Sequence, residues 1–328
     1  MIQKIRARIT GTGSFVPPHR MTNADFEKIV DTSNEWITTR TGIKERRIAN
    51  GMPTSDMAVA ACEKALEMAH CDKEDIDLLI NATVTPDYRL PSNGCVIQEK
   101  LGLPNAVAYD IVSACTGFIN GLIIANANIA TGTNRKALVI GSEKLSAITN
   151  YQDRTTCVLF GDAAGAVVLE PSDNDHGLVS SFMKSDGTLR NLLWQEVGGT
   201  QNPYSPDYNF DGRDKISMNG SDVFKVAVKE MARAVQIVLE QARVDPSEIA
   251  LFIPHQANLR IIDALAKRLK IDGERVYKNI DKYGNTSSAS VPLALDEANR
   301  EGRIKSGDYV VMVAFGGGLI WGASLVKW

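Results

Sequence analysis

The chain has 328 residues, of which 36 are Lys or Arg and 39 are Asp or Glu, so a net charge of −3 gives no overall electrostatic reason to bind nucleic acid or an anionic membrane. With 44% apolar and 23% charged residues, the composition is that of a globular protein, and no apolar run approaches the roughly 20 residues of a membrane span. Five cysteines form no C-x-x-C pair and the N-terminus lacks the apolar stretch of a secretion signal, so we expect reduced thiols and a cytoplasmic location.

Strand-like and helix-like stretches alternate from the N-terminus onward. Residues 1–10 alternate apolar and charged side chains, which is typical of a strand. Short, nearly all-apolar runs predict further buried strands at 78–80, 137–140, 166–169, 251–253 and 310–313. Helical spacing of apolar residues predicts amphipathic helices at 55–69 and 222–242, and residues 117–130 are apolar on nearly all sides, as in a buried helix. This alternation predicts an α/β fold whose sheets are covered by helices.

Two parts of the chain resemble each other. Residues 71–80 parallel residues 244–253, and residues 134–141 parallel residues 306–313, in the same order and at an offset of about 170 residues, one domain length. One interpretation is that any two α/β segments look alike. We favour two copies of one α/β unit, 1–172 and 173–328, related by a pseudo-twofold axis near which strand ends and a functional site would meet.

Cys115 is the cysteine whose surroundings predict chemistry. It follows a strand that ends near residue 112 and precedes the buried helix, so it lies at a helix N-terminus. The helix dipole and free N–H groups there stabilise a thiolate or an oxyanion. Cys62 and Cys71, in or near a surface helix, and Cys157, in an expected apolar strand, fit the common role of a small buried residue, and Cys95 is left undecided.

The second copy supplies a histidine and an asparagine. Of the four histidines, His255 follows the strand 251–253, whereas His19, His70 and His176 lie in turns, at a helix end or in a loop. Asn285 follows an expected strand at 276–280, close to the position that corresponds to Cys115. Cys, His and Asn together indicate activated thiol chemistry.

A papain-like hydrolase also uses Cys, His and Asn, and 140 residues (255 − 115) separate Cys115 from His255, within that family's rough range. Its C-G-[SA]-C-[WY] signature is absent, and it does not explain the duplication.

The glycine-rich segments predict turns and not nucleotide binding. Residues 11–16 lack the third glycine of a dinucleotide fingerprint, and no P-loop motif occurs. Glycines at 161–165 and 316–318 predict tight turns or close backbone approach, and those at 316–318 follow a strand near the expected site, where an N–H could be a second oxyanion donor. No His/Cys/Asp cluster has metal-ligand spacing, so we expect neither a metal nor a cofactor.

Six motifs in order strongly resemble those of β-ketoacyl-acyl-carrier-protein synthase III, a condensing-enzyme family of the thiolase superfamily. They are residues 36–46 (WITTRTGIKER), 113–118 (SACTGF), 161–165 (GDAAG), 255–258 (HQAN), 283–287 (YGNTS) and 315–318 (FGGG). Thr116 and Ala163 depart from the commonest pattern without touching the expected catalytic residues. The resemblance covers essentially the whole chain and implies a layered α-β-α-β-α sandwich with mixed sheets.

The resemblance also implies a reaction, the initiating decarboxylative Claisen condensation of type II fatty acid biosynthesis. Cys115 would accept the acyl group of an acyl-coenzyme A primer, first of all acetyl-coenzyme A, with the N–H groups of Cys115 and Gly317 as the oxyanion hole. His255 and Asn285 would then donate hydrogen bonds to the thioester oxygen of malonyl-acyl-carrier protein. Loss of CO2 leaves an enolate that attacks the acyl-cysteine.

Binding residues are implied in the same way. The coenzyme A contacts would be Trp36, Arg40, Arg154, Gly220 and Asn258. Leu90 would line the acyl pocket of a neighbouring subunit in a homodimer. The acidic carrier would dock on the basic residues Lys225, Arg260, Lys267 and Arg268. A related thiolase-fold enzyme with a different acyl transfer, and an inactive carrier-binding subunit, are alternatives.

Overall fold

A computed structural model describes residues 5–172, 174–205 and 207–328, and within them two mixed β-sheets form the framework. The first sheet has the strand order β1-β7-β6-β4-β5 and the second β8-β13-β12-β11. In each sheet the first two pairs of neighbouring strands are antiparallel, and the pairs that follow are parallel. The first sheet consists of β1 (Arg6–Phe15), β4 (Leu78–Ala82), β5 (Val107–Ile111), β6 (Ala137–Lys144) and β7 (Asp162–Ser172). The second consists of β8 (Gly177–Ser185), β11 (Ile249–Pro254), β12 (Tyr309–Gly316) and β13 (Ile320–Lys327).

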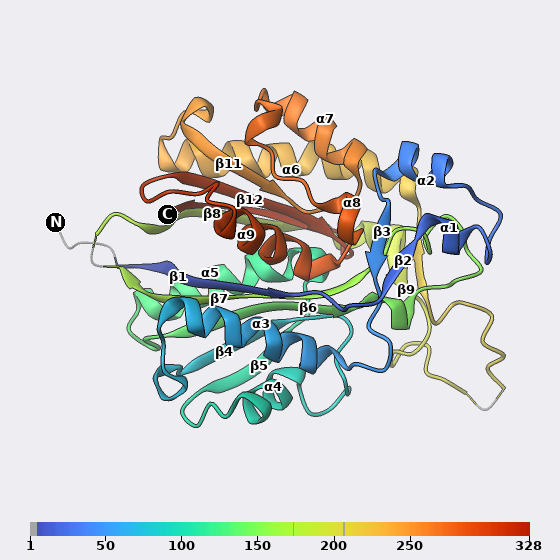
Figure 1. Ribbon diagram of the computed structural model, residues 1–328, viewed down its shortest axis with the longest axis horizontal. Helices are drawn as coiled ribbons and strands as arrows, with labels where there is room; N and C mark the ends of the chain where they lie inside the picture. Colours follow the sequence, from blue (N-terminus) through green and yellow to red (C-terminus); the bar gives the residue numbers. More distant parts are fainter. Residues whose placement is uncertain (1–4, 173, 206) are drawn as a thin grey trace.

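Helices separate and cover the two sheets, as Figure 1 shows. α5 (Gly117–Ala130) and α9 (Ser290–Arg300) lie between the sheets and contact strands of both. α3 (Thr54–Ala69) and α4 (Asn93–Leu101) cover the outer face of the first sheet, and α6 (Gly220–Ala242), with α7 (Leu259–Leu269) packed on it, covers the second. The layered α-β-α-β-α sandwich is therefore confirmed.

Shorter elements complete the chain. Two small sheets pair β2 (Arg20–Thr22) with β3 (Glu45–Arg47) and β9 (Leu193–Gln195) with β10 (Ile216–Met218). The remaining α-helices of the described residues are α1 (Asn23–Phe26), α2 (Asn34–Thr41) and α8 (Ile280–Tyr283). None of the helices in the described part of the chain combines the length and apolarity needed to cross a bilayer.

The elements agree with the sequence prediction except at two places, and residues 1–4 of the strand expected at 1–10 lie outside the described residues. The expected strand at 276–280 is reduced to a single bridge between Val276 and Phe252, because the chain turns away into α8. Cys157 is buried as expected, but it lies in a series of turns before β7 and not in a strand. The bridge occupies the place beside β11 that β5 occupies beside β4, so the two sheets keep the same order.

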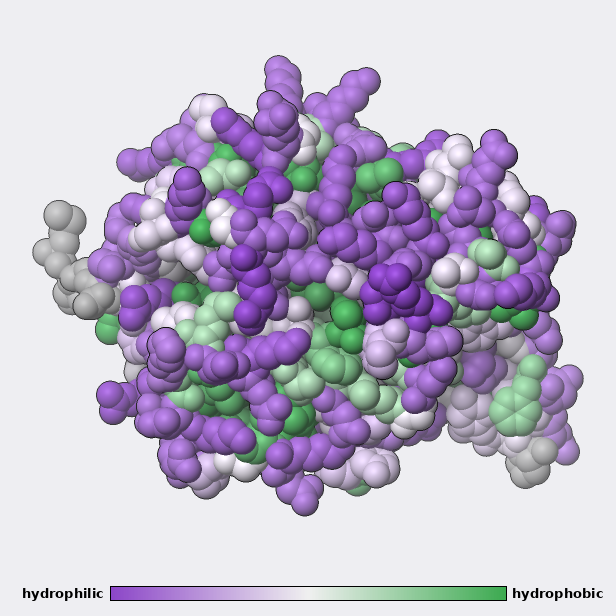
Figure 2. All heavy atoms as spheres, in the orientation of Figure 1, coloured by the Kyte–Doolittle hydropathy of each residue, from purple (hydrophilic) through white to green (hydrophobic). Residues whose placement is uncertain are grey.

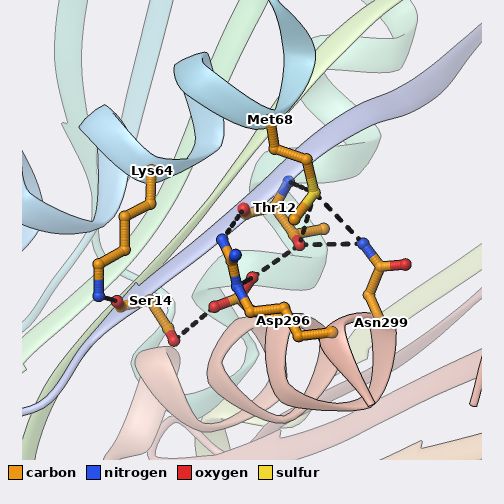
Figure 3. A network of polar contacts seen from close by, with 7 residues as sticks. Thr12, Ser14, Lys64, Met68, Asp296 and Asn299 are labelled. Carbon is orange, nitrogen blue, oxygen red and sulfur yellow. Dashed lines mark hydrogen bonds and ion pairs between the residues drawn. The ribbon is translucent and has the colours of Figure 1, made fainter. Parts of the chain in front are cut away.

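A buried polar network ties the first strand to the last helix (Figure 3). The Asp296 carboxylate on α9 is 2% exposed and accepts hydrogen bonds from Thr12 Oγ1 at 2.7 Å, Ser14 Oγ at 2.6 Å and Arg300 Nε at 2.8 Å. A buried carboxylate with three donors is strongly held, whereas the same donors without it would be unsatisfied. This network fixes α9, and the turn that precedes it, against the first half of the chain.

Candidate active site

Cys115 lies on a tight turn between β5 and α5. A 3-10 turn, η2 (Ala114–Thr116), leads directly into α5, and Ala114 has the left-handed φ of 44°. Gly117 starts the helix, where a Cβ would lie 2.6 Å from the Cβ of Ala82. Glycine at this position therefore lets α5 pack directly on β4 and places Cys115 at the N-terminus of a buried helix, as the sequence predicts.

The thiol of Cys115 is less acidic than its place in the fold suggests. Burial raises its pKa from 9.0 to about 12, while hydrogen bonds from the Ser287 side chain and from its own backbone N–H lower it. Burial therefore opposes the thiolate that the helix N-terminus is expected to stabilise, because the removal of water outweighs these donors.

His255 follows β11 and is held by its backbone and by its ring. Its N–H donates to Val313 O at 2.7 Å, and its Nδ1 lies 2.5 Å from Ser290 Oγ. The side chain is fully buried, which lowers its pKa from 6.5 to about 3, so the imidazole is neutral at physiological pH. When the Ser290 hydroxyl donates to Nδ1, the ring hydrogen is on Nε2, the tautomer that a hydrogen-bond donor needs.

Asn285 lies between α8 and the 3-10 turn η7 (Ser287–Ala289). Its backbone forms hydrogen bonds with Leu159 O at 2.8 Å and Gly161 N at 3.0 Å. Its side-chain Oδ1 accepts the Ser287 N–H at 2.9 Å. Since Oδ1 is occupied in this way, the amide Nδ2 is the group left to donate to a ligand. A Cβ on Gly161 would lie 2.3 Å from Tyr283 O, which accounts for the close approach predicted for this glycine.

Two cavities meet at these side chains. The outer cavity, of about 670 Å³, is lined by Cys115, His255 and Asn285 at one end and reaches Trp36 and Arg40. The second cavity, which we call the inner cavity, has a volume of about 260 Å³ and a mostly apolar lining, and it reaches the surface at Val112, which is 80% exposed. It is lined by Val84, Val112, Ala114, Cys115, Leu145, Ile148, Phe160, Leu193, Trp194, Gln195, Ile216, Met218, Asn285, Ser287 and Gly317. The three residues predicted to form the catalytic centre are therefore brought together, with an outer and an inner space on either side of the thiol.

The glycines 316–318 close the site beside Cys115. Gly317 lines the inner cavity together with the thiol. A Cβ on Gly316 would lie 2.7 Å from the backbone N of Cys115, so any side chain there would fill the space in front of that N–H. Both observations fit the expected oxyanion hole, which requires open access to backbone donors.

Of the residues expected to contact coenzyme A, Trp36 and Arg40 line the outer cavity, and Arg154 packs against the Trp36 ring without lining that cavity. The guanidinium carbons of Arg40 and Arg154 lie 5.5 and 5.4 Å from the centroid of the Trp36 ring. Arg154 also donates to Asp31 O at 2.7 Å. These cation–π contacts form a platform for a planar base, although a base stacked between Trp36 and Arg154 would have to push the Arg154 side chain away from the ring.

The other two expected contacts, Gly220 and Asn258, line the same cavity. Asn258 is the N-cap of α7, where its Oδ1 accepts the Arg260 N–H at 2.9 Å, and its Nδ2 donates to Arg40 O at 3.1 Å. The structure thus gives Asn258 a capping role that the sequence analysis did not predict. Gly220 begins α6 and has room for a ligand, since a Cβ there would touch nothing nearer than the Met218 side chain at 3.8 Å.

The four basic residues expected to dock a carrier do not form one patch. Lys225 and Arg260 line the outer cavity, whereas Lys267 and Arg268 lie in the last turn of α7, about 11 Å further along the helix at 1.5 Å per residue. Arg268 lines a separate groove at the ends of α6 and α7. Arg260 is the second residue of α7, nearer to the helix start than one full turn.

Leu90 lines neither cavity of its own subunit. It is 87% exposed and precedes α4. The remaining cysteines lie outside both cavities, with Cys62, Cys71 and Cys157 buried and Cys95 exposed. Within the residues that the structure describes, no group of three or more His, Cys, Asp or Glu side chains could hold a metal ion.

Three polar residues at the site were missed by the sequence analysis: Ser287, Ser290 and the buried Glu143. Serine and glutamate are common residues, and neither type by itself indicates a catalytic site. For the two serines the sequence contains one signal of a site: Ser287 is the last residue of the motif 283–287, and Ser290 lies three residues after it. Glu143 lies in none of the six motifs.

The two-sheet layered fold, with a cysteine, a histidine and an asparagine at the junction of its halves, defines a condensing enzyme of the thiolase fold, and comparisons with known proteins agree. Family models described as "3-Oxoacyl-[acyl-carrier-protein (ACP)] synthase III" and its "C terminal" part match residues 109–187 and 239–328. The chain is 52% identical to "Beta-ketoacyl-[acyl-carrier-protein] synthase III" of Caldanaerobacter subterraneus subsp. tengcongensis over 100% of this chain and 99% of the relative.

A protein of the same name from Clostridioides difficile is 52% identical over 98% of each chain. The crystal structure of 3-oxoacyl-[acyl-carrier-protein] synthase III from Aquifex aeolicus superimposes with a TM-score of 0.92 at 48% identity, covering 98% of this chain and 100% of that one. The chain belongs to the β-ketoacyl-[acyl-carrier-protein] synthase III family. It is an acyltransferase of the condensing type, which initiates fatty acid synthesis, and the papain-like interpretation is wrong.

Proposed function

We propose that the enzyme transfers the acyl group of an acyl-coenzyme A primer, first of all acetyl-coenzyme A, to Cys115 and condenses it with malonyl-acyl-carrier protein. The products are 3-ketoacyl-acyl-carrier protein, coenzyme A and CO2. The observation that carries the proposal is the convergence of Cys115, His255 and Asn285 on one cavity that Trp36 also lines, with two arginines in contact with the Trp36 ring.

The first half-reaction is acyl transfer. Coenzyme A would enter past Trp36, Arg40 and Arg154 and place its thioester at Cys115. The sulfur attacks the carbonyl carbon, and the tetrahedral oxyanion is held by the N–H groups of Cys115 and Gly317. Coenzyme A leaves as a thiol after it takes a proton, and the acyl chain extends into the inner cavity.

The second half-reaction is condensation. His255 Nε2 and Asn285 Nδ2 donate hydrogen bonds to the thioester oxygen of the malonyl group, and cleavage of its C–C bond releases CO2 and leaves an enolate. The enolate carbon attacks the acyl-cysteine, and the Cys115 sulfur departs with the electron pair of its C–S bond. Because decarboxylation itself generates the carbanion, these steps use no resident cofactor.

The inner cavity supports primers longer than acetyl. Its lining is mainly aliphatic and aromatic, and its volume of about 260 Å³ exceeds what a two-carbon group fills. Short branched chains are therefore included in the proposed substrate class. A panel of acyl-coenzyme A primers at fixed malonyl-carrier ranks them directly.

We further propose that the enzyme works in the cytoplasm as a homodimer built on the β5 edge. β5 is the outermost strand of its sheet. Val107, which begins β5, is 54% exposed, and Val112, which directly follows it, is 80% exposed. Tyr88 and Leu90, between β4 and α4, are also exposed, at 60% and 87%. On the face drawn in Figure 2, apolar side chains reach the surface over this lower sheet, whereas the α6 and α7 side is mostly hydrophilic. Exposed strand edges with apolar side chains favour pairing with another copy.

The test is acylation measured by mass spectrometry. Incubation with acetyl-coenzyme A or another accepted primer should add one acyl mass to the Cys115 peptide, and addition of malonyl-carrier should release it as a 3-ketoacyl product. Acylation of Cys62, Cys71, Cys95 or Cys157 in its place would contradict the proposal. A product formed without an acyl-Cys115 intermediate would contradict it as well.

A further inference from the structure

The turn that carries Cys115 has a counterpart in the second half of the chain. α9 is preceded by the 3-10 turn η7 as α5 is preceded by η2, and the first residue of each turn is left-handed, with φ of 44° at Ala114 and 49° at Ser287. A left-handed residue other than glycine costs on the order of 1–3 kcal/mol and persists where the surroundings impose it. Ser287 is therefore a strained residue at the junction of the halves.

Ser287 lines the same cavity as the reactive sulfur. Ser287 is 4% exposed and lines the inner cavity together with Cys115 and Asn285. Its N–H is held by Asn285 Oδ1, so the backbone of this turn is fixed. Burial raises the pKa of the Cys115 thiol, and hydrogen bonding from the Ser287 side chain lowers it.

We propose that Ser287 is a further catalytic residue, whose hydroxyl donates a hydrogen bond to the Cys115 sulfur and stabilises it as a thiolate. The inference rests on the proposed function, in which that thiolate forms twice: before attack on the primer and again when the acyl group leaves. His255 and Asn285 are engaged with the thioester oxygen in the second step, so the sulfur needs a donor of its own.

Glu143 on β6 determines where the single Ser287 proton goes. Glu143 is fully buried, and its Oε2 accepts from Val84 N–H at 3.1 Å and Thr85 Oγ1 at 2.7 Å. Ser287 is also within hydrogen-bonding reach of this carboxyl group, so an ionised Glu143 would compete with the sulfur for the same proton. Burial raises the pKa of Glu143, which favours the neutral acid and leaves the Ser287 proton for Cys115.

Proton counting at Ser288 supports a neutral Glu143. Ser288 Oγ lies 2.9 Å from Ala82 O and 2.9 Å from Glu143 Oε1, but one hydroxyl has one proton to donate. If Glu143 carries a proton on Oε1 and donates it to Ser288, Ser288 can donate to Ala82 and both contacts are satisfied. Glu143 is thus a positioning residue that acts through the two serines.

The experiment compares Ser287→Ala with Ser287→Gly. Both variants remove the hydroxyl, but glycine adopts φ of 49° without strain, so its melting temperature should be at or above that of Ser287→Ala. Iodoacetamide alkylation of Cys115 is followed by mass spectrometry from pH 6 to pH 9, below the thiol pKa, where the rate reports the thiolate fraction. Both variants should be alkylated at least about tenfold more slowly at every pH, as expected for one hydrogen bond to a charged group.

Two measurements separate a chemical from a structural role. Decarboxylation of malonyl-carrier, which depends on His255 and Asn285, should fall by a smaller factor than the alkylation rate in both Ser287 variants. Ser142→Ala is the matched control, because it removes a buried serine hydroxyl on β6 that donates to Asn81 at 2.7 Å, outside both cavities, and it should be alkylated like the wild type. Glu143→Gln keeps a neutral donor and acceptor and should remain within about threefold of the wild-type alkylation rate.

Several results would overturn the inference. If both Ser287 variants are alkylated at the wild-type rate, Ser287 does not donate a hydrogen bond to the sulfur. If alkylation is slow in Ser287→Ala but not in Ser287→Gly, the effect comes from backbone strain and not from the hydroxyl. A tenfold loss in Glu143→Gln would mean that an ionised carboxylate is required. If no acyl-coenzyme A acylates wild-type Cys115, the proposed function fails, while the alkylation series still decides the role of Ser287.

Discussion

Burial lowers the pKa of His255 from 6.5 to about 3, so folding holds this imidazole in its neutral form. In the unfolded chain the same side chain binds a proton as the pH falls below about 6.5. Because the unfolded state then binds more protons, the contribution of His255 to the free energy of unfolding is complete above pH 6.5 and falls by about 1.4 kcal/mol per pH unit below it, down to the folded pKa. Between pH 7 and pH 5 this amounts to about 2 kcal/mol.

Urea unfolding of the wild type and of His255→Gln at pH 7, 6 and 5 measures this effect. Glutamine has no proton to gain, so the wild type should lose about 2 kcal/mol more than the variant between pH 7 and pH 5. His19→Gln, which changes an exposed histidine, is the control and should follow the wild type. Parallel curves for wild type and His255→Gln would mean that the folded pKa of His255 is not lowered, and the conclusion that folding holds this imidazole neutral would be refuted.

Cys115→Ala should carry no acyl group yet still release CO2 from malonyl-carrier, whereas Asn285→Ala should release it about 10²–10³-fold more slowly; equal rates would contradict the donor role. Arg260→Glu should raise KM for malonyl-carrier at least about tenfold at low salt and less at high salt. Lys267→Glu, at the far end of α7, should change KM by less than about threefold. A larger effect of Lys267→Glu than of Arg260→Glu would place carrier docking at that far end. Asp296→Ala should lower the free energy of unfolding in urea by about 3 kcal/mol, because the buried Thr12 hydroxyl and the partly buried Ser14 and Arg300 donors lose their acceptor, and an unchanged midpoint would show that the network is not stabilising.

The periodic parts of the fold follow from the sequence. The apolar stretch 117–130 predicts α5 with the bounds that the structure has, because a helix buried between two sheets needs apolar side chains all round. The short strands at 78–80 and 251–253 are likewise present as β4 and β11, each extended by two or three residues. Of the five cysteines, Cys115 is the one that lines both cavities, as predicted, because the strand, turn and helix around it are adjacent in the sequence.

The interactions inside the site could not be predicted because they join distant residues. Glu143 meets Ser288 across 145 positions, and no motif marks either residue as a partner of the other. The rise in the pKa of the Cys115 thiol could not be predicted for the same reason, since its desolvation depends on how completely the second half of the chain covers it. The split of the basic residues between two ends of α7 required the helix orientation, which composition does not contain.

The charge distribution of the inner cavity explains why a buried, weakly acidic cysteine suits this reaction. Among the described residues that line it there is no Lys, Arg, Asp or Glu, and the polar groups facing Cys115 are a serine hydroxyl, an asparagine amide and backbone N–H groups, with a neutral His255 at the outer side. Each anion of the proposed cycle, whether thiolate, tetrahedral oxyanion or enolate, forms and disappears within one turnover. A fixed cation would stabilise the anionic ground states as well as the transition states and would slow their decay, whereas oriented neutral dipoles around a buried sulfur favour charge where it develops and release it afterwards.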